Sequence, residues 1–374
     1  MTNSEDYQEN FEHFEDNIVE EEANEIPREI RKINTQAYDK SVSDIVRMIE
    51  DGDINLNPEY QRNYIWDNKK ASLLIESIIL NVPIPVIYVS QEEDDSWTVI
   101  DGLQRLNSLH RFFQRDFKIS GLDFLTELNK SDVKNLNPKA LRVLRNGLLR
   151  IIVISFDSHP EIKYDVFMRL NTGSVKLNEQ ELRNCLYRGN FNEALKEVVA
   201  YESLLTLFNL KEPHNRMIDC ELILRYLTIS ENLDSKSGII KDYKGRMKIS
   251  LNEFMITHQN ITKDKADELM QKVKDSADKV LKIYGAKAFR RINVKDSFES
   301  TLNRALIDIL MVTANYFTID ELEKNADAIY KKYEDLSLND TPFRNSITIG
   351  TSDKKVITYR LKRWLDELNL IING

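Results

Sequence analysis

The spacing of apolar residues changes near residue 176, and this change most constrains the fold. Before it, β-branched runs at 85–90, 97–100 and 149–156 predict strands among segments of helical period. From residue 178 onward the apolar residues recur almost wholly at helical spacing. We therefore predict an α+β fold, in which a mixed domain (residues 30–176) is followed by an all-helical domain (residues 177–374).

Capping residues mark where several helices begin. Ser41 and Asn178 are each followed by an acidic residue three positions later, which is the spacing of a capping box. Asp67 precedes a third segment whose apolar residues recur at helical intervals. The sequence therefore predicts helices that start directly after Ser41, Asp67 and Asn178.

The charge of the chain is unevenly distributed. Residues 1–25 contain ten acidic residues and no Lys or Arg, whereas the rest of the chain carries 52 basic and 51 acidic residues. The formal net charge of −9 thus belongs to the N-terminal segment. We predict that residues 1–25 form an acidic disordered tail. It either solubilises the protein or covers a basic nucleic-acid groove in the resting state.

Several classes of protein are excluded by what the sequence lacks. Its two cysteines, Cys185 and Cys220, lie far apart without metal-ligand spacing, which argues against a disulfide framework and favours a reducing compartment. No window has the length of about 18 apolar residues that a membrane span needs, and the N-terminal residues lack the pattern of a secretory signal. We expect a cytoplasmic protein with no membrane partner.

A strand-to-helix corner at residues 97–113 carries the main candidate site. Asp101 and Gly102 break the predicted strand, and Gln104 and Arg105 lie in the first turn of the helix that follows. A helix N-terminus offers backbone N–H groups and partial positive charge to an anion. Gly102 allows close approach of the backbone, and the Arg105 guanidinium suits phosphate oxygens. Taken alone, however, Asp-Gly is also typical of an ordinary turn.

Each polar residue of this corner has a chemical role in phosphoryl transfer. Asp101 could hold Mg²⁺, orient an attacking water, or orient Arg105. Gln104 could position that water, and Arg105 could pair with a phosphate. Asp101, Gln104 and Arg105 are therefore the candidate catalytic residues, Gly102 is a nucleotide-binding candidate, and Mg²⁺ is the candidate cofactor.

Two further clusters add nucleotide-binding candidates. Arg62, next to Gln61, is a second cation for the charge that develops in phosphoryl transfer, although it could instead pair with Glu59 or Asp67. Asn171, Thr172 and Gly173 could supply amide and backbone contacts, although they are also typical of a helix C-cap.

Together, three stretches closely resemble the N-terminal domain family of GmrSD-type restriction endonucleases. They are Asn57–Asp67 with the helix and Pro-rich segment after it, Val99–Arg105, and Val166–Gly173 followed by Gln180–Asn184. The resemblance covers about residues 35–185, and Arg216–Glu221 fits the same pattern. It does not extend to the acidic segment at the N-terminus.

The resemblance implies a ParB/sulfiredoxin-like fold and a place in bacterial anti-phage defence. Related proteins use an Asp-Gly-Gln-Gln-Arg signature to bind and hydrolyse nucleoside triphosphates, and Asp101, Gly102, Gln104 and Arg105 match it. Leu103 replaces the first Gln, which removes one amide from the site. On a helix, Leu103 could point toward the core while Gln104 and Arg105 face the ligand.

Full-length relatives often carry an HNH-type nuclease, but the five histidines of this sequence are isolated and form no such pattern. We therefore expect DNA cleavage to come from a partner nuclease. Basic clusters could contact DNA phosphates or could form solvated helical faces. The clusters are Lys139, Arg142, Arg145 and Arg150; Lys241, Lys244, Arg246 and Lys248; and Lys287, Arg290, Arg291 and Lys295. We take Arg142, Arg145, Arg290 and Arg291 as the DNA-binding candidates.

The leading hypothesis is a regulatory protein that binds and hydrolyses a nucleoside triphosphate in a restriction-type defence system. The alternative is a non-enzymatic, ParB-like DNA-binding or adaptor module, which the replacement at Leu103 favours. An independent nuclease with an unfamiliar site is a third hypothesis.

Overall fold

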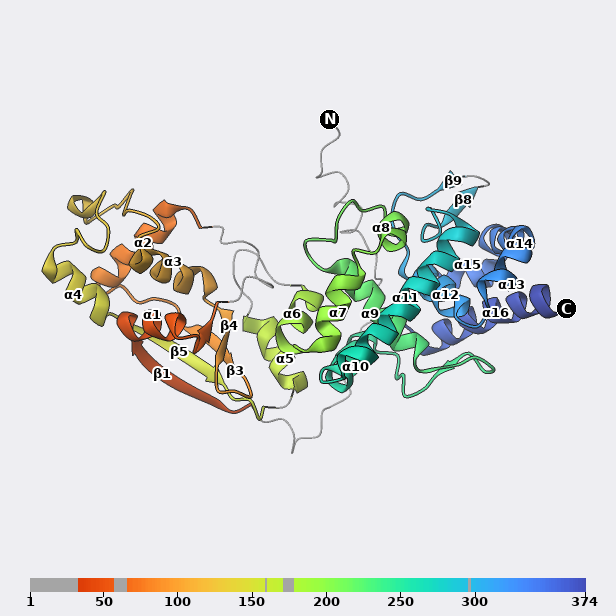
Figure 1. Ribbon diagram of the computed structural model, residues 1–374, viewed down its shortest axis with the longest axis horizontal. Helices are drawn as coiled ribbons and strands as arrows, with labels where there is room; N and C mark the ends of the chain where they lie inside the picture. The colour runs from red at the N-terminus through yellow and green to blue at the C-terminus, as the bar shows by residue number, and fades with distance from the viewer. Residues whose placement is uncertain (1–32, 57–65, 159, 171–177, 295–296) are drawn as a thin grey trace. The chain divides into compact units, whose positions relative to one another are not determined.

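The computed structural model describes residues 33–56, 66–158, 160–170, 178–294 and 297–374 (Figure 1). The predicted acidic tail, residues 1–25, lies outside these ranges. The described chain divides into two compact units, with the boundary in the sequence between Leu182 and Arg183.

The first unit combines a five-stranded sheet with helices. Its elements are β1 (Thr35–Ser41), α1 (Val42–Glu50), β2 (Ile54–Asn55), α2 (Asn68–Ile79), β3 (Ile87–Gln91), β4 (Trp97–Asp101), α3 (Leu103–Gln114), the short 3₁₀ helix η3 (Thr126–Leu128), α4 (Pro138–Asn146), β5 (Leu148–Ile154), α5 (Pro160–Leu170) and the start of α6 (Glu179–Leu186).

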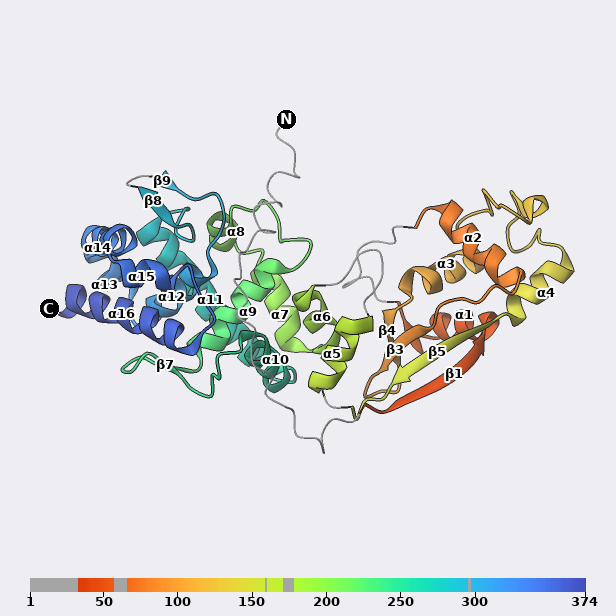
Figure 2. The same cartoon turned by 180° about the vertical axis from the view of Figure 1, so that it is seen from behind.

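The sheet is mixed, with strand order β1-β5-β3-β4-β2. The pairs β1–β5 and β3–β4 are antiparallel, whereas β3–β5 and β2–β4 are parallel. Helices α1, α2 and α3 lie over one face, as both views show (Figures 1 and 2). Ile87, Val89 and Ile151 of the strands are buried in one core with Leu106 and Leu109 of α3. The corner between β4 and α3 is therefore built on a packed scaffold.

The predicted helix starts and strands of this unit are confirmed. The Ser41 side chain accepts from the Asp44 N–H, and the Asp67 side chain accepts from the Lys70 N–H at 2.7 Å. Asn178 and Glu181 exchange two side-chain-to-backbone bonds at the start of α6. Strands β1 and β2 were not predicted, because β1 is mostly exposed and polar and β2 has only two residues.

Helices dominate the second unit, but the prediction that it is all-helical is wrong. Two short antiparallel strand pairs interrupt the helices, and strands of two or three residues leave no readable period. The elements are the end of α6, α7 (Asn190–Val198), α8 (Glu202–Phe208), α9 (Ile218–Ser230), β6 (Leu233–Asp234), β7 (Ile239–Ile240), α10 (Met247–His258), α11 (Lys263–Tyr284), β8 (Ile292–Val294), β9 (Ser297–Phe298), α12 (Arg304–Ala314), α13 (Ile319–Lys324), α14 (Ala326–Asn339), α15 (Thr341–Ser346) and α16 (Lys354–Asn373). Among the described helices of the chain, none has the length and apolar character to cross a membrane.

A buried acidic residue, Asp308, holds two arginines inside this unit. Asp308 and Arg360 are fully buried and Arg225 is nearly so. Arg225 Nη2 and Arg360 Nη2 lie 2.7 and 2.6 Å from Asp308 Oδ2. Burial lowers the pKa of Arg360 to about 10, and the Asp308 carboxylate opposes that shift. Asp308 is thus the nearest counter-charge for two cations that water does not reach.

Replacing Asp308 by Ala should destabilise the protein by about 3–5 kcal/mol, because it leaves two buried guanidinium groups without that counter-charge. Asp366→Ala is the matched control, since Asp366 pairs with Lys362 on the surface and its loss should cost less than about 1 kcal/mol. Urea unfolding of both variants measures the difference. Equal stability of the two variants would contradict the assignment.

Glu76 of α2 is a buried acid that fixes a loop of the first unit. Its carboxylate accepts from the backbone N–H groups of Phe124 and Leu125 at 2.8 and 2.6 Å, and from that of Asp123 at 3.3 Å. Burial alone would raise the pKa of Glu76, but the three N–H donors outweigh it and the pKa lies below its ordinary value of 4.5. The ionised form therefore stabilises the folded state.

Glu76→Gln should destabilise the protein by about 1–3 kcal/mol at pH 7, since one acceptor oxygen becomes an amide donor facing backbone N–H groups. A pKa lowered on folding gives stability that is complete above 4.5 and is lost as the pH falls toward the folded-state pKa. The difference between wild type and variant should therefore shrink below about pH 4.5. Urea unfolding at pH 7 and pH 3.5 checks this, and a pH-independent difference would refute it.

Candidate functional site

The corner between β4 and α3 begins with a β-bulge. Asp101 pairs with Tyr88 and Val99 pairs with Val89, so Ile100 is an extra residue on β4 without a partner on β3. A bulge bends the strand and re-aims the side chains that follow it. Asp101, the last residue of β4, keeps about a third of its side-chain surface exposed.

Gly102 makes the turn possible. Its φ of +105° lies in the left-handed region, and a Cβ built there would meet Ile87 Cγ1 at 2.9 Å and Arg105 Nη2 at 3.2 Å. Gly102 was predicted to allow the close approach of a ligand. In the structure the crowding comes from the protein's own side chains, so Gly102 is required by the corner itself.

Arg105 ties the corner to the start of β3. Its Nη2 donates to Asp101 Oδ2 at 2.8 Å, its Nη1 donates to the Pro85 carbonyl, and both nitrogens lie 3.4 Å from the Val86 carbonyl. Burial lowers the pKa of Arg105, and the Asp101 carboxylate opposes that shift. The side chain is only 11% exposed. The guanidinium that the sequence assigned to phosphate thus already has acceptors within the protein.

Leu103 and Gln104, which lie between Gly102 and Arg105, make different contacts. Leu103, the departure from the signature, is buried in the core of the first unit, so this position contributes packing. Gln104 Oε1 accepts from the Trp66 N–H at 3.2 Å. Gln104 therefore fixes the backbone just before α2. In the sequence, this point directly follows the segment that contains Gln61 and Arg62.

The first turn of α3 carries no negative charge. The N-cap residue is Gly102, which has no side chain that could cap the helix. The first turn, Leu103–Arg105, contains no acidic residue. The Gly102 carbonyl accepts the first helical bond, from the Leu106 N–H at 3.0 Å. The preceding backbone N–H groups lie at the positive end of the helix dipole.

The structure brings together only part of the predicted site. Asp101, Gly102, Gln104 and Arg105 lie at one corner, whereas Gln61, Arg62, Asn171, Thr172 and Gly173 lie outside the described residues. Among the described residues, no group of three or more His, Cys, Asp or Glu side chains could hold a metal ion. Asp101 is thus a single candidate ligand, which fits Mg²⁺ that a substrate's phosphates also coordinate.

The DNA-binding candidates separate by burial. Arg142 and Arg145 are exposed on α4. Arg291 is bound to Glu299 at 2.6 Å. Arg290 is a buried residue: it is 8% exposed, its Nη1 donates to the Ala286 carbonyl, and burial lowers its pKa.

Sequence reasoning missed the backbone groups of the site. The carbonyls of Pro85 and Val86 and the N–H of Trp66 complete the corner. The signal for the carbonyls was the pair Pro83 and Pro85, because proline keeps the chain extended and cannot donate to a strand ladder.

Gly102→Ala should destabilise the protein by about 1–3 kcal/mol, because it combines backbone strain with contacts to Ile87 and Arg105. Gly52→Ala is the control: its φ is +85°, but nothing lies within 4 Å of the added Cβ. Thermal unfolding should therefore rank Gly102→Ala below Gly52→Ala. The reverse order would show that crowding at the corner is unimportant.

Comparison with known proteins places the corner within a domain family. Residues 42–188 match the family model described as "GmrSD restriction endonuclease, N-terminal domain". No curated protein and no solved structure matches the chain. The match spans all of the described corner, from α1 to the end of α6. Residues 42–188 of this chain are therefore similar to the N-terminal domain of GmrSD restriction endonucleases.

Proposed function

We propose that the first unit binds a nucleoside triphosphate at the β4–α3 corner and hydrolyses it. In this proposal the unit has a ParB/sulfiredoxin-like fold, and the protein is a cytoplasmic regulator or sensor in a restriction-type anti-phage system. The match of residues 42–188 to the GmrSD N-terminal domain family supports that context. The observation that carries the proposal is the Asp101–Arg105 pair at the uncapped start of α3.

The corner can exchange its internal bonds for phosphate oxygens. Both contacts of Arg105 with the Val86 carbonyl are 3.4 Å long, beyond the usual range for N–H···O bonds, so losing them costs little. A phosphate at the α3 N-terminus would gain the helix N–H groups and a charge-assisted bond from Arg105. The Asp101 carboxylate, 2.8 Å from Nη2, would keep the guanidinium oriented.

Asp101 is also the residue that would hold Mg²⁺. When bound with a triphosphate, Mg²⁺ neutralises phosphate charge and orients the phosphate oxygens. Gln61 and Arg62, which lie outside the described residues, stand five and four positions before Trp66 in the sequence. Because the Trp66 N–H is bound to Gln104, both stay candidates for this site.

A different class of function remains the second candidate, namely a non-enzymatic, ParB-like DNA-binding or adaptor module. Two observations favour it. The Arg105 guanidinium already has acceptors within the protein, and Leu103, at the position of the first Gln of the signature, is buried. In either case we propose that cleavage of DNA comes from a partner nuclease.

Phosphate release from each of the four nucleoside triphosphates with Mg²⁺ tests the proposal. Arg105→Ala should lower turnover at least about a hundredfold, since it removes the donor nearest to the developing charge. Arg47→Ala is the control, because Arg47 is an exposed arginine of α1 that pairs with Asp44. Thermal unfolding of each variant separates lost chemistry from lost folding.

Arg105→Lys keeps the positive charge but loses the bidentate geometry of the guanidinium. It should therefore retain nucleotide binding better than Arg105→Ala. Nucleotide binding without turnover in the wild-type protein would favour the adaptor function. Wild-type protein that neither binds nor hydrolyses any of the four nucleotides would overturn the proposal.

A further inference from the structure

A second, separate surface of the chain concentrates positive charge. Six basic residues come from two segments of the second unit that are more than 100 residues apart in sequence: Lys241, Lys244, Arg246, Lys248, Lys354 and Lys355. We call these six residues the basic platform. Lys241, Lys244, Lys354 and Lys355 are exposed, whereas Arg246 and Lys248 are half-buried. Arg246 and Lys248 lie at the start of α10, and Lys354 and Lys355 begin α16.

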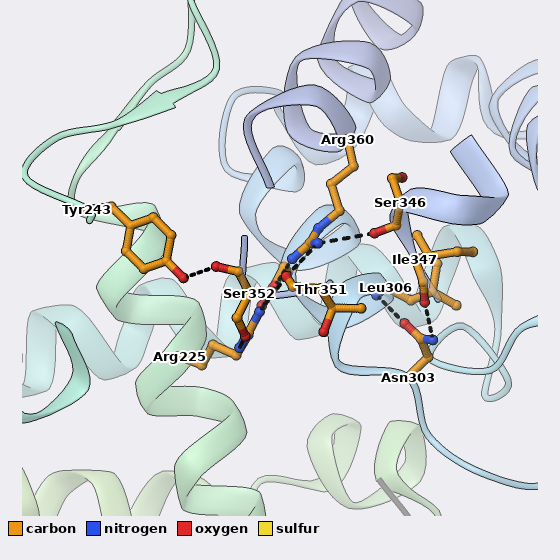
Figure 3. Close-up of polar contacts among 10 residues, drawn as sticks. Arg225, Tyr243, Asn303, Leu306, Ser346, Ile347, Thr351, Ser352 and Arg360 are labelled. Atoms are coloured by element: carbon orange, nitrogen blue, oxygen red, sulfur yellow. Dashed lines mark hydrogen bonds and ion pairs between the residues drawn. The ribbon is translucent and has the colours of Figure 1, made fainter. Parts of the chain in front are cut away.

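The two segments lie against each other. A Cβ built on Gly245 would lie 3.8 Å from the Lys354 backbone nitrogen, and one on Gly238 would lie 2.7 Å from Lys362 Cβ. The buried Tyr243 hydroxyl donates to the Ser352 carbonyl, as Figure 3 shows. The strand pair β6–β7 and the start of α10 therefore pack on the first turns of α16.

The buried Arg225 and Arg360 bind the loop that precedes α16. Arg360 Nη1 donates to the Thr351 carbonyl at 2.7 Å and to the Ser346 carbonyl at 3.2 Å, while Arg225 lies 3.4 Å from Ser352 Oγ (Figure 3). These bonds hold the loop that leads into α16. The backbone that carries Lys354 and Lys355 is thus ordered before any ligand arrives.

Both helices of the platform carry lysines in their first turn. The first turns, Met247–Ile249 and Lys354–Val356, contain lysines and no acidic residue. Cations at the positive end of a helix dipole are unfavourable. Placing two such helix ends side by side adds repulsion, which an anionic partner would relieve.

Within the two segments of the platform, cations outnumber acidic residues, and Asp234 of β6 is a further acidic neighbour of Lys241. In the two segments, residues 241–248 and 353–355, Asp242 and Asp353 oppose six cations, and the Asp353 carboxylate caps α16 by accepting from the Lys355 and Val356 N–H groups. The chain beyond the acidic residues 1–25 has a net charge of only +1, so this surplus of four is a local concentration.

We propose that the basic platform binds the phosphate backbone of DNA without reading its sequence. Six cations spread over two helix ends and the segment between β7 and α10 suit a row of phosphates better than one small anion. An anionic membrane would in addition need a large apolar face, and the platform consists of charged side chains. This surface lies in the second unit, whereas the proposed nucleotide site lies in the first, so neither proposal depends on the other.

Fluorescence anisotropy of a short labelled DNA duplex with the full-length protein, at several NaCl concentrations and without nucleotide, tests the proposal. The wild type should bind with a log–log salt slope of several units. The triple variant Lys244→Gln, Arg246→Gln, Lys354→Gln should lose at least about tenfold in affinity, and its slope should fall by about 2 to 3, at about 0.9 per lost phosphate contact.

The matched control is Lys263→Gln, Lys265→Gln, Lys324→Gln, which removes the same charge from exposed positions on α11 and α13. It should keep wild-type affinity and slope, and thermal unfolding should show both triple variants folded. Equal loss in the two triple variants, or no salt-dependent binding by the wild type, would overturn the proposal. Stronger competition by anionic lipid vesicles than by unlabelled duplex would replace DNA with a membrane.

The anisotropy assay contains no nucleotide, and the phosphate-release assay contains no DNA. Failure of one assay therefore leaves the other interpretable.

Discussion

The ion pair between Asp101 and Arg105 is the interaction on which the candidate site depends. It joins the last residue of β4 to the first turn of α3, across a glycine that no other residue could replace without strain. Through the same guanidinium it also holds the carbonyls at the start of β3. Two strands and a helix are therefore fixed around one cation, and any ligand at the α3 N-terminus meets a preorganised frame.

The second unit uses the same device with a different outcome. Arg360, like Arg105, is paired with an aspartate and also donates to backbone carbonyls of a non-helical segment. The planar guanidinium has five N–H donors, so one side chain can satisfy a carboxylate and several carbonyls at once. The difference lies in access: Arg360 is fully buried, whereas Arg105 and Asp101 reach the surface. Only the Arg105–Asp101 pair is accessible enough to exchange one of its hydrogen bonds for a bond to a ligand.

Features that depend on residues close together in the sequence were predicted, and those that depend on distant residues were not. Local signals worked: the caps at Ser41, Asp67 and Asn178 act over three residues, and each begins a helix as expected. The corner was found because Asp101 to Arg105 are contiguous. Interactions between distant residues were not readable, which is why the buried state of Arg290 was missed.

The same limit explains the rest of the site. The bond from Trp66 to Gln104 joins residues 38 positions apart, and nothing in either local sequence announces it. Strand β1 was missed because it pairs with β5 more than 100 residues away and is exposed along most of its length. The basic platform shows the same effect, since residues 241–248 gave a modest charge cluster until the start of α16 was placed beside them.

Burial also sets how the two proposed sites respond to salt. Ionic screening acts strongly on exposed charges and weakly on buried ones. Lys354 and Lys355 are exposed, so their attraction for phosphates depends on the counterions they displace. Arg105 is 11% exposed and 2.8 Å from its carboxylate partner. A net charge of −9 for the whole chain hides both facts, because the acidic residues 1–25, a nearly neutral body and a basic platform are averaged into one number.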